Sequence, residues 1–144
     1  MNPWLVFIYK VPNEPSARRV YVWRKLKRLG AILIQDSAWV LPANARTREK
    51  LQWLAGEVND MDDGEAMLWE AAPIVAPKDV DIVQQFSDQA DAQYKHILRQ
   101  LEKKNPDLSA LSRQYQQADA QDYFQSKLGQ KARQALIERR GNKS

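Results

Sequence analysis

Cysteine is absent from this chain of 144 residues, and histidine occurs once, as His96. Without cysteine there is no disulfide framework, no thiolate metal site and no cysteine nucleophile. A lone histidine is not a zinc site, because zinc takes three or four ligands and no other ligand type clusters around His96. These absences exclude disulfide-stabilised domains and thiol enzymes, and they point to a cytoplasmic protein.

Familiar catalytic motifs are missing as well. The sequence has no glycine-rich phosphate loop, no Ser-x-x-Lys or Gly-x-Ser-x-Gly motif and no paired-carboxylate motif. The acids Asp60, Asp62, Asp63 and Glu65 do not follow the spacing of a calcium-binding loop, so a solvated acidic turn explains them better than a metal site. We therefore expect no enzymatic activity, no bound metal and no cofactor.

No long hydrophobic run is present either. The apolar run near the start of the chain ends by Val11, and no basic segment precedes it, so it is neither a signal peptide nor a membrane span. Apolar residues nevertheless make up 44% of the chain and include five tryptophans, which is enough for a buried core. The length fits one domain, or one domain with an appendage, and we expect no contact with a membrane.

Acidic residues are scarce in the first third of the chain. Residues 1–50 carry ten Lys/Arg and three Asp/Glu, a net charge of +7, whereas residues 51–144 have a net charge of −3. Exposed helices usually mix charges, because i,i+4 ion pairs stabilise them and like charges destabilise them. One predicted helix instead carries six cations and no acid, which indicates an external anion such as the phosphate backbone of a nucleic acid. The six candidate phosphate-binding residues are Arg18, Arg19, Arg24, Lys25, Lys27 and Arg28.

Two other interpretations of this helix stay open. Helical spacing places Arg24, Lys27 and Arg28 on its exposed side, where phosphate contacts would give salt-dependent affinity with little sequence preference. In the first alternative, the cations extend over the apolar surface or pair with acids elsewhere in the chain. In the second, they bind the segment Glu57–Asp91 of another copy, which holds ten acids and one lysine.

The hydrophobic pattern predicts the order β-α-β-β-α-β in residues 1–76, which is that of an α+β, ferredoxin-like sandwich. Both helices are expected on one face of a four-stranded antiparallel sheet, with the first and third strands at its centre. Ser16 is the expected cap of the first helix, and Gly30 is its expected C-terminal stop. The predicted elements are strands at 4–9, 31–34, 38–41 and 66–71, and helices at 17–29 and 47–59.

Residues 77–144 are predicted to form a helical extension that packs on this domain or serves as a dimer arm. Apolar residues recur at helical spacing from Asp79 onward, until Asn105-Pro106-Asp107 breaks the pattern. Asn105 is the expected cap of the next helix, with Pro106 at its first position. Gly129 is expected to interrupt the helical pattern once more.

The tryptophans are more often core residues than binding residues. We predict that Trp39 and Trp69 are buried, because each lies within a strand. Trp23 lies toward the flank of its helix, where it could anchor a partner.

Several segments together carry a family resemblance: Trp4-Leu5 to Tyr9-x-Val11-Pro12, Pro15-Ser16 to Arg19-Val20, Trp23-Arg24-Lys25-Leu26-Lys27-Arg28-Leu29-Gly30-Ala31, Gln35-Asp36-Ser37-x-Trp39-Val40-Leu41-Pro42, Trp53-Leu54-Ala55, Gly64-Glu65-Ala66-x-Leu68-Trp69-Glu70 and Asp122-Tyr123-Phe124. They resemble the N-terminal domain of the ChrB family of chromate-resistance regulators over almost the whole chain. A weaker likeness connects the chain with PaaX-type repressors and with small CRISPR-associated ferredoxin-like proteins.

The resemblance implies a ferredoxin-like domain followed by helices, in a DNA-binding transcription regulator related to chromate resistance. Full-length family members carry a second domain, whereas this chain stops at Ser144. We therefore expect a stand-alone short form, a homodimer or a partner protein that supplies a sensing domain. A protein-interaction module that binds no nucleic acid is the alternative.

A metal-dependent nuclease is a further alternative. Some of the CRISPR-associated relatives hold a metal with an aspartate at the end of the first strand, but here that strand ends Tyr9-Lys10-Val11-Pro12 without a carboxylate. Asp36 is the one carboxylate in the strand-turn block, and this hypothesis depends on it.

Overall fold

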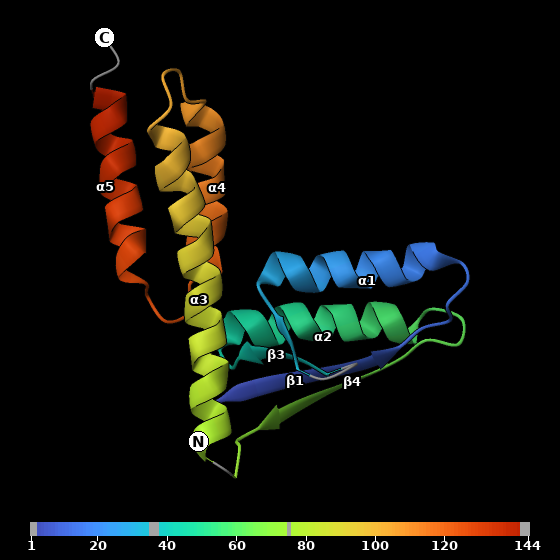
Figure 1. The fold of residues 1–144 in the computed structure, drawn as a ribbon. Coiled ribbons are helices and arrows are strands. Elements are labelled where there is room, and N and C mark those ends of the chain that lie inside the picture. The colour runs from blue at the N-terminus through green and yellow to red at the C-terminus, as the bar shows by residue number, and fades with distance from the viewer. Residues whose placement is uncertain (1–2, 35–37, 75, 142–144) are drawn as a thin grey trace. The chain divides into compact units, whose positions relative to one another are not determined.

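The computed structural model describes residues 3–34, 38–74 and 76–141 (Figure 1). The chain divides into two compact units, residues 1–75 and 76–144, which are described separately. The first unit consists of β1 (Trp4–Lys10), α1 (Ser16–Leu29), β2 (Ile32–Ile34), β3 (Ala38–Pro42), α2 (Ala45–Asn59) and β4 (Glu65–Ala71). This order of strands and helices is the one that the hydrophobic pattern predicts.

The four strands form one antiparallel sheet in the order β2-β3-β1-β4, so the first and third strands are central, as predicted. Both helices lie on one side of this sheet (Figure 1). The core lies between the two layers, because alternate residues of each strand point toward the helices. Its buried members are Leu5, Phe7, Trp39 and Leu41 from the sheet, and Val22, Leu26, Leu51, Leu54 and Val58 from the helices.

The two ends of α1 follow from Pro15 and Gly30. Pro15 has an extended backbone at the N-cap position and supplies no side-chain hydrogen bond, so Ser16 is the first helical residue. The expectation that Ser16 caps the helix was therefore wrong, because the fixed geometry of the preceding proline already sets the turn into the helix. At the other end, Gly30 adopts the left-handed conformation with φ 82°, which confirms it as the stop signal.

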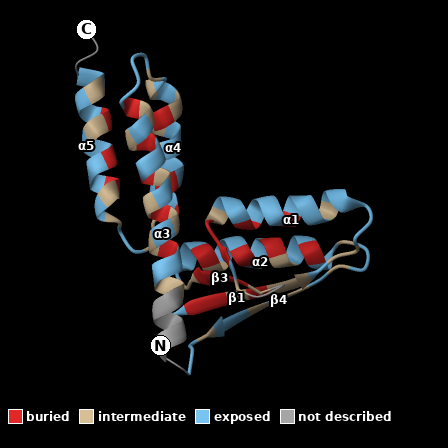
Figure 2. Cartoon of the chain, in the orientation of Figure 1, coloured by how far each residue is buried: buried red, intermediate tan, exposed pale blue. Residues whose placement is uncertain are grey.

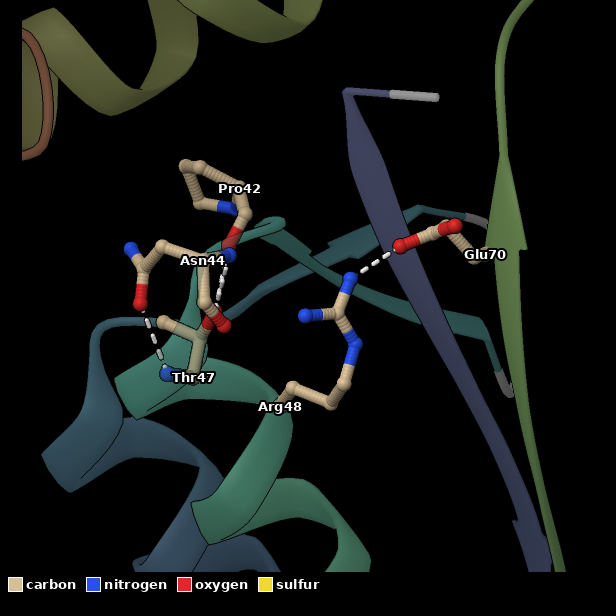
Figure 3. A network of polar contacts seen from close by, with 5 residues as sticks. All are labelled: Pro42, Asn44, Thr47, Arg48 and Glu70. Carbon is tan, nitrogen blue, oxygen red and sulfur yellow. Dashed lines mark hydrogen bonds and ion pairs between the residues drawn. The ribbon is translucent and has the colours of Figure 1, made fainter. Parts of the chain in front are cut away.

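A capping box forms the N-terminus of α2, and a further hydrogen bond links this turn to β3 (Figure 3). The backbone N–H of Thr47 donates to Oδ1 of Asn44 at 2.8 Å, and the Asn44 N–H donates to Oγ1 of Thr47 at 3.0 Å. The Thr47 hydroxyl also donates to the carbonyl of Pro42 at 2.6 Å. The helix therefore begins at Ala45, two residues before the predicted start. Arg48, one residue after Thr47, forms an ion pair with Glu70 of β4.

The second unit is built from α3 (Ala76–Leu101), α4 (Leu108–Ala120) and α5 (Lys127–Gly141). Buried residues of all three helices form one hydrophobic cluster, and buried positions are red in Figure 2. The carboxylate of Asp107 accepts from the N–H of Ala110 at 3.1 Å, so Asp107 caps α4. The prediction of Asn105 as cap and Pro106 as first helical residue was wrong, because Asp107 offers a carboxylate at the required offset. Among the described residues, no helix is long and apolar enough to cross a membrane.

The turn between α4 and α5 is held by a polar network and by aromatic contacts with α3. The hydroxyl of Tyr94, which is fully buried, donates to Asp122 at 2.9 Å, and the N–H of Ser126 donates to the same carboxylate at 3.0 Å. The rings of Tyr123 and Phe124 contact Phe86 of α3, with centroids 5.9 and 6.0 Å apart. The helical pattern therefore breaks at this turn, and Gly129 lies within α5 rather than at a break.

Candidate nucleic-acid interface

The basic helix α1 has one buried stripe, formed by Val22 and Leu26, and its other residues are exposed except Arg18 and Leu29, which are half-buried (Figure 2). At 100° per residue, Arg24 lies about 200° around the helix from Val22 and so points away from the sheet. Arg24 makes no ion pair with any residue that the structure describes. Arg18 is half-buried, whereas the other five candidate cations are exposed. The geometry thus presents positive charge outward along most of α1.

The six predicted phosphate-binding residues do not share one surface. Arg18 donates to the backbone carbonyl of Asp62 at 3.0 Å, so it supports the turn between α2 and β4. Lys25 and Arg28 line a groove toward α2. Arg19 lies on the opposite flank of α1, where it makes a long hydrogen bond of 3.4 Å to Asn13. The structure therefore brings Arg24 and Lys27 together with Arg28 on the outer surface, with Arg18 and Arg19 at its two margins.

Aromatic rings lie between these cations. The Lys25 ammonium is 5.5 Å from the centre of the Tyr21 ring, and the Lys27 ammonium is 5.9 Å from that of Trp23. Both distances fit cation–π contacts. Tyr21 also hydrogen-bonds Glu57 of α2, and this contact raises the pKa of its hydroxyl.

Tryptophan positions confirm two expectations and contradict one. Trp23 is 50% exposed, as expected of an anchor, and Trp39 is buried in the core. The prediction that Trp69 is buried was wrong, since its side chain is 55% exposed. Trp69 pairs with Val6 in the sheet register, so it lies on the face opposite Leu5 and away from the helices. Alternation along a strand cannot tell which of the two faces is covered.

The groove between α1 and α2 contains residues that the sequence analysis missed. It has a volume of about 460 Å³, and α2 contributes Arg46, Lys50 and Trp53 to its lining beside Lys25 and Arg28 of α1. Arg46, Lys50 and Trp53 follow an i, i+4, i+7 spacing, which places them on one stripe of the helix. That spacing, with the nearby N-cap Asn44, is the signal that could have found them.

A second cavity, of about 670 Å³, lies at the end of β1 on the other flank of α1. Lys10, Arg19 and Trp23 contribute to its lining together with Tyr9. Burial raises the pKa of the Tyr9 hydroxyl, and the positive charge of Arg19 partly opposes this shift. The cavity therefore combines cations and the carboxylate of Glu65 with aromatic surface.

Carboxylates do not gather into a metal site in the part of the chain that the structure describes. Within those residues, no group of three or more His, Asp or Glu side chains is placed to hold a metal ion. The acidic segment after α2 forms a turn in which Asp63 has a positive φ of 59°. Asp36, on which the nuclease hypothesis depends, lies outside the described residues.

Comparison with known proteins assigns the family. The family model for the N-terminal domain of protein ChrB matches residues 19–100, from α1 into α3. Protein ChrB of Cupriavidus metallidurans is 32% identical over 94 residues, which are 65% of this chain and 25% of that protein. The chain thus matches about a quarter of the length of this curated relative. No solved structure matches the chain.

The range matched by the family model contains residues 19–28 of the basic run, but not Arg18. It also contains the whole of α2 and β4. The segments Trp4–Pro12 and Asp122–Phe124, which also carried the sequence resemblance, lie outside that range. Because the matched range is more than half of the chain, this protein belongs to the ChrB N-terminal family.

Proposed function

We propose that this protein is a DNA-binding regulatory protein related to chromate resistance, and that it acts by binding rather than by catalysis. The observation that carries the proposal is the outward presentation of Arg24, Lys27 and Arg28 on a helix without acids. Such a surface neutralises phosphates and releases counterions, which favours DNA of any sequence. Membership of the ChrB N-terminal family supports the regulatory role.

We propose further that the first unit is a ferredoxin-like domain. The strand order β2-β3-β1-β4 and the placement of both helices on one side of the sheet support this assignment. In this arrangement the sheet serves as a rigid support, and α1 is the element that meets the phosphate backbone.

The test is DNA binding measured against salt concentration. Fluorescence anisotropy of labelled duplex DNA from the gene's own upstream region is recorded at several salt concentrations, with and without chromate. The triple variant Arg24→Ala/Lys27→Ala/Arg28→Ala should bind more weakly, and its slope of log K against log salt should fall by roughly two to three, since each lost phosphate contact removes about 0.9.

A matched control removes equal charge from the second unit. Lys103, Lys104 and Lys131 are exposed there, and their replacement by alanine should leave the salt slope unchanged. If the α1 variant keeps the wild-type slope, or if the control loses as much, α1 is not the phosphate-binding surface. Release of the wild-type protein from DNA by chromate would place the effector site in this chain.

The second candidate is a protein-interaction module. Met67 and Trp69 are more than half exposed on the sheet face opposite the core, on the edge strand β4, and such apolar surface favours a protein partner. A homodimer, or a partner protein that supplies a sensing domain, would cover it. Failure to bind DNA at low salt, together with self-association that persists at high salt, would favour this candidate, because salt screens charges but not apolar contacts.

A further inference from the structure

Trp53 is the most exposed tryptophan of the described residues, with 70% of its surface accessible. A large aromatic ring on a helix surface usually turns toward the core, so its position here needs an explanation. The ring lies in the groove between α1 and α2, whose lining also holds four cations and two carboxylates. The cations are Lys25 and Arg28 from α1 and Arg46 and Lys50 from α2, and the carboxylates are Glu49 and Glu57 of α2.

Charge is unevenly distributed along this groove. The helices are antiparallel (Figure 1), so the last turn of α1 lies beside the first turn of α2. Arg28 and Arg46 therefore gather at one end, where the N-terminus of α2 adds a partial positive charge. At the other end, the Glu57 carboxylate accepts a hydrogen bond from the Tyr21 hydroxyl. At the Arg46 end, Glu49 offsets only part of the charge of Arg28, Arg46 and Lys50, so an anion is favoured there.

The spacing along α2 separates the aromatic surface from the cations. With a rise of 1.5 Å per residue, Lys50 lies about 4.5 Å and Arg46 about 10.5 Å along the helix axis from Trp53. A ligand that joins one flat ring to a chain of phosphates matches this arrangement. Bases of a duplex are stacked inside and cannot present a face to Trp53, whereas the bases of a single strand can.

We propose that the groove between α1 and α2 binds single-stranded DNA, with one base stacked on Trp53 and the adjoining phosphates beside Lys50 and Arg46. This inference rests on the proposed function and specifies the form of DNA that one part of the basic surface accepts. Duplex DNA binds through the outer cations of α1, and unpaired nucleotides in addition engage the groove.

The experiment compares Trp53→Ala with Trp69→Ala in the full chain. Both tryptophans are exposed, but Trp69 lies on the opposite face of the sheet, so its variant is the matched control. Binding of labelled oligothymidine and of a labelled duplex is measured by anisotropy, and circular dichroism checks that each variant is folded. Quenching of tryptophan fluorescence by oligothymidine and by thymidine monophosphate is recorded in parallel.

Trp53→Ala should weaken binding of oligothymidine by at least about five-fold, in line with the loss of one base–aromatic stack, and should leave duplex binding unchanged. The variant should also lose most of the fluorescence quenching, whereas Trp69→Ala should keep both. Equal binding of oligothymidine by the two variants overturns the inference, as does an equal loss of duplex binding by Trp53→Ala.

Failure of this inference and failure of the proposed function are distinguishable. If wild type binds the duplex but Trp53→Ala changes nothing, the inference alone is wrong. If wild type binds neither form of DNA, the proposed function is wrong as well. Quenching by the monophosphate at concentrations as low as those of oligothymidine would identify a free nucleotide as the ligand, and would also overturn the assignment to a DNA strand.

Discussion

Gly129 allows α5 to pack closely against the ring of Tyr94. A Cβ atom at this position would lie 2.9 Å from Cζ of Tyr94, and the ring cannot move easily because Tyr94 is fully buried and bonded to Asp122. Gly129→Ala should therefore lower the free energy of unfolding by about 1–2 kcal/mol, since overpacking outweighs the gain in helix propensity. Urea denaturation followed by circular dichroism measures the change.

Gly56→Ala is the matched control for Gly129→Ala. Gly56 lies on the exposed surface of α2, and a Cβ there would meet no atom within 4 Å. Gly56→Ala should raise the free energy of unfolding by about 0.5–1 kcal/mol, because only the propensity gain remains. Stabilisation by both substitutions would contradict the close contact at Tyr94.

At the scale of elements, α2 depends on its first turn. Asn44→Ala removes the acceptor for the Thr47 N–H, although the Thr47 hydroxyl keeps its bond to the Pro42 carbonyl. We expect the free energy of unfolding to fall by about 1 kcal/mol. Asn44→Asp retains an acceptor and should be close to wild type in the same urea experiment. An Asn44→Ala variant as stable as wild type would show that the capping box contributes nothing.

The sequence predicts elements better than it predicts surfaces. Apolar periodicity places every strand and helix of residues 4–71 within two residues of its observed bounds, because each element must bury one stripe or face. Exposure depends on which face is covered, and that is a tertiary property. The exposure of Trp69 and Trp53 therefore could not be predicted from their own segments. The six predicted phosphate-binding cations lie on different surfaces of α1, and this became visible only when α2 was placed beside α1.

At the scale of the whole molecule, all five tryptophans lie in residues 1–75 and none in residues 76–144. Tryptophan fluorescence therefore reports on the first unit alone, whereas helical circular dichroism reports on both. Each unit has its own buried core, so we expect two separable unfolding transitions. Asn44→Ala should lower the urea midpoint of the fluorescence transition, and Gly129→Ala should leave that midpoint unchanged while shifting the dichroism curve. If both substitutions move the fluorescence midpoint equally, the units unfold as one cooperative body.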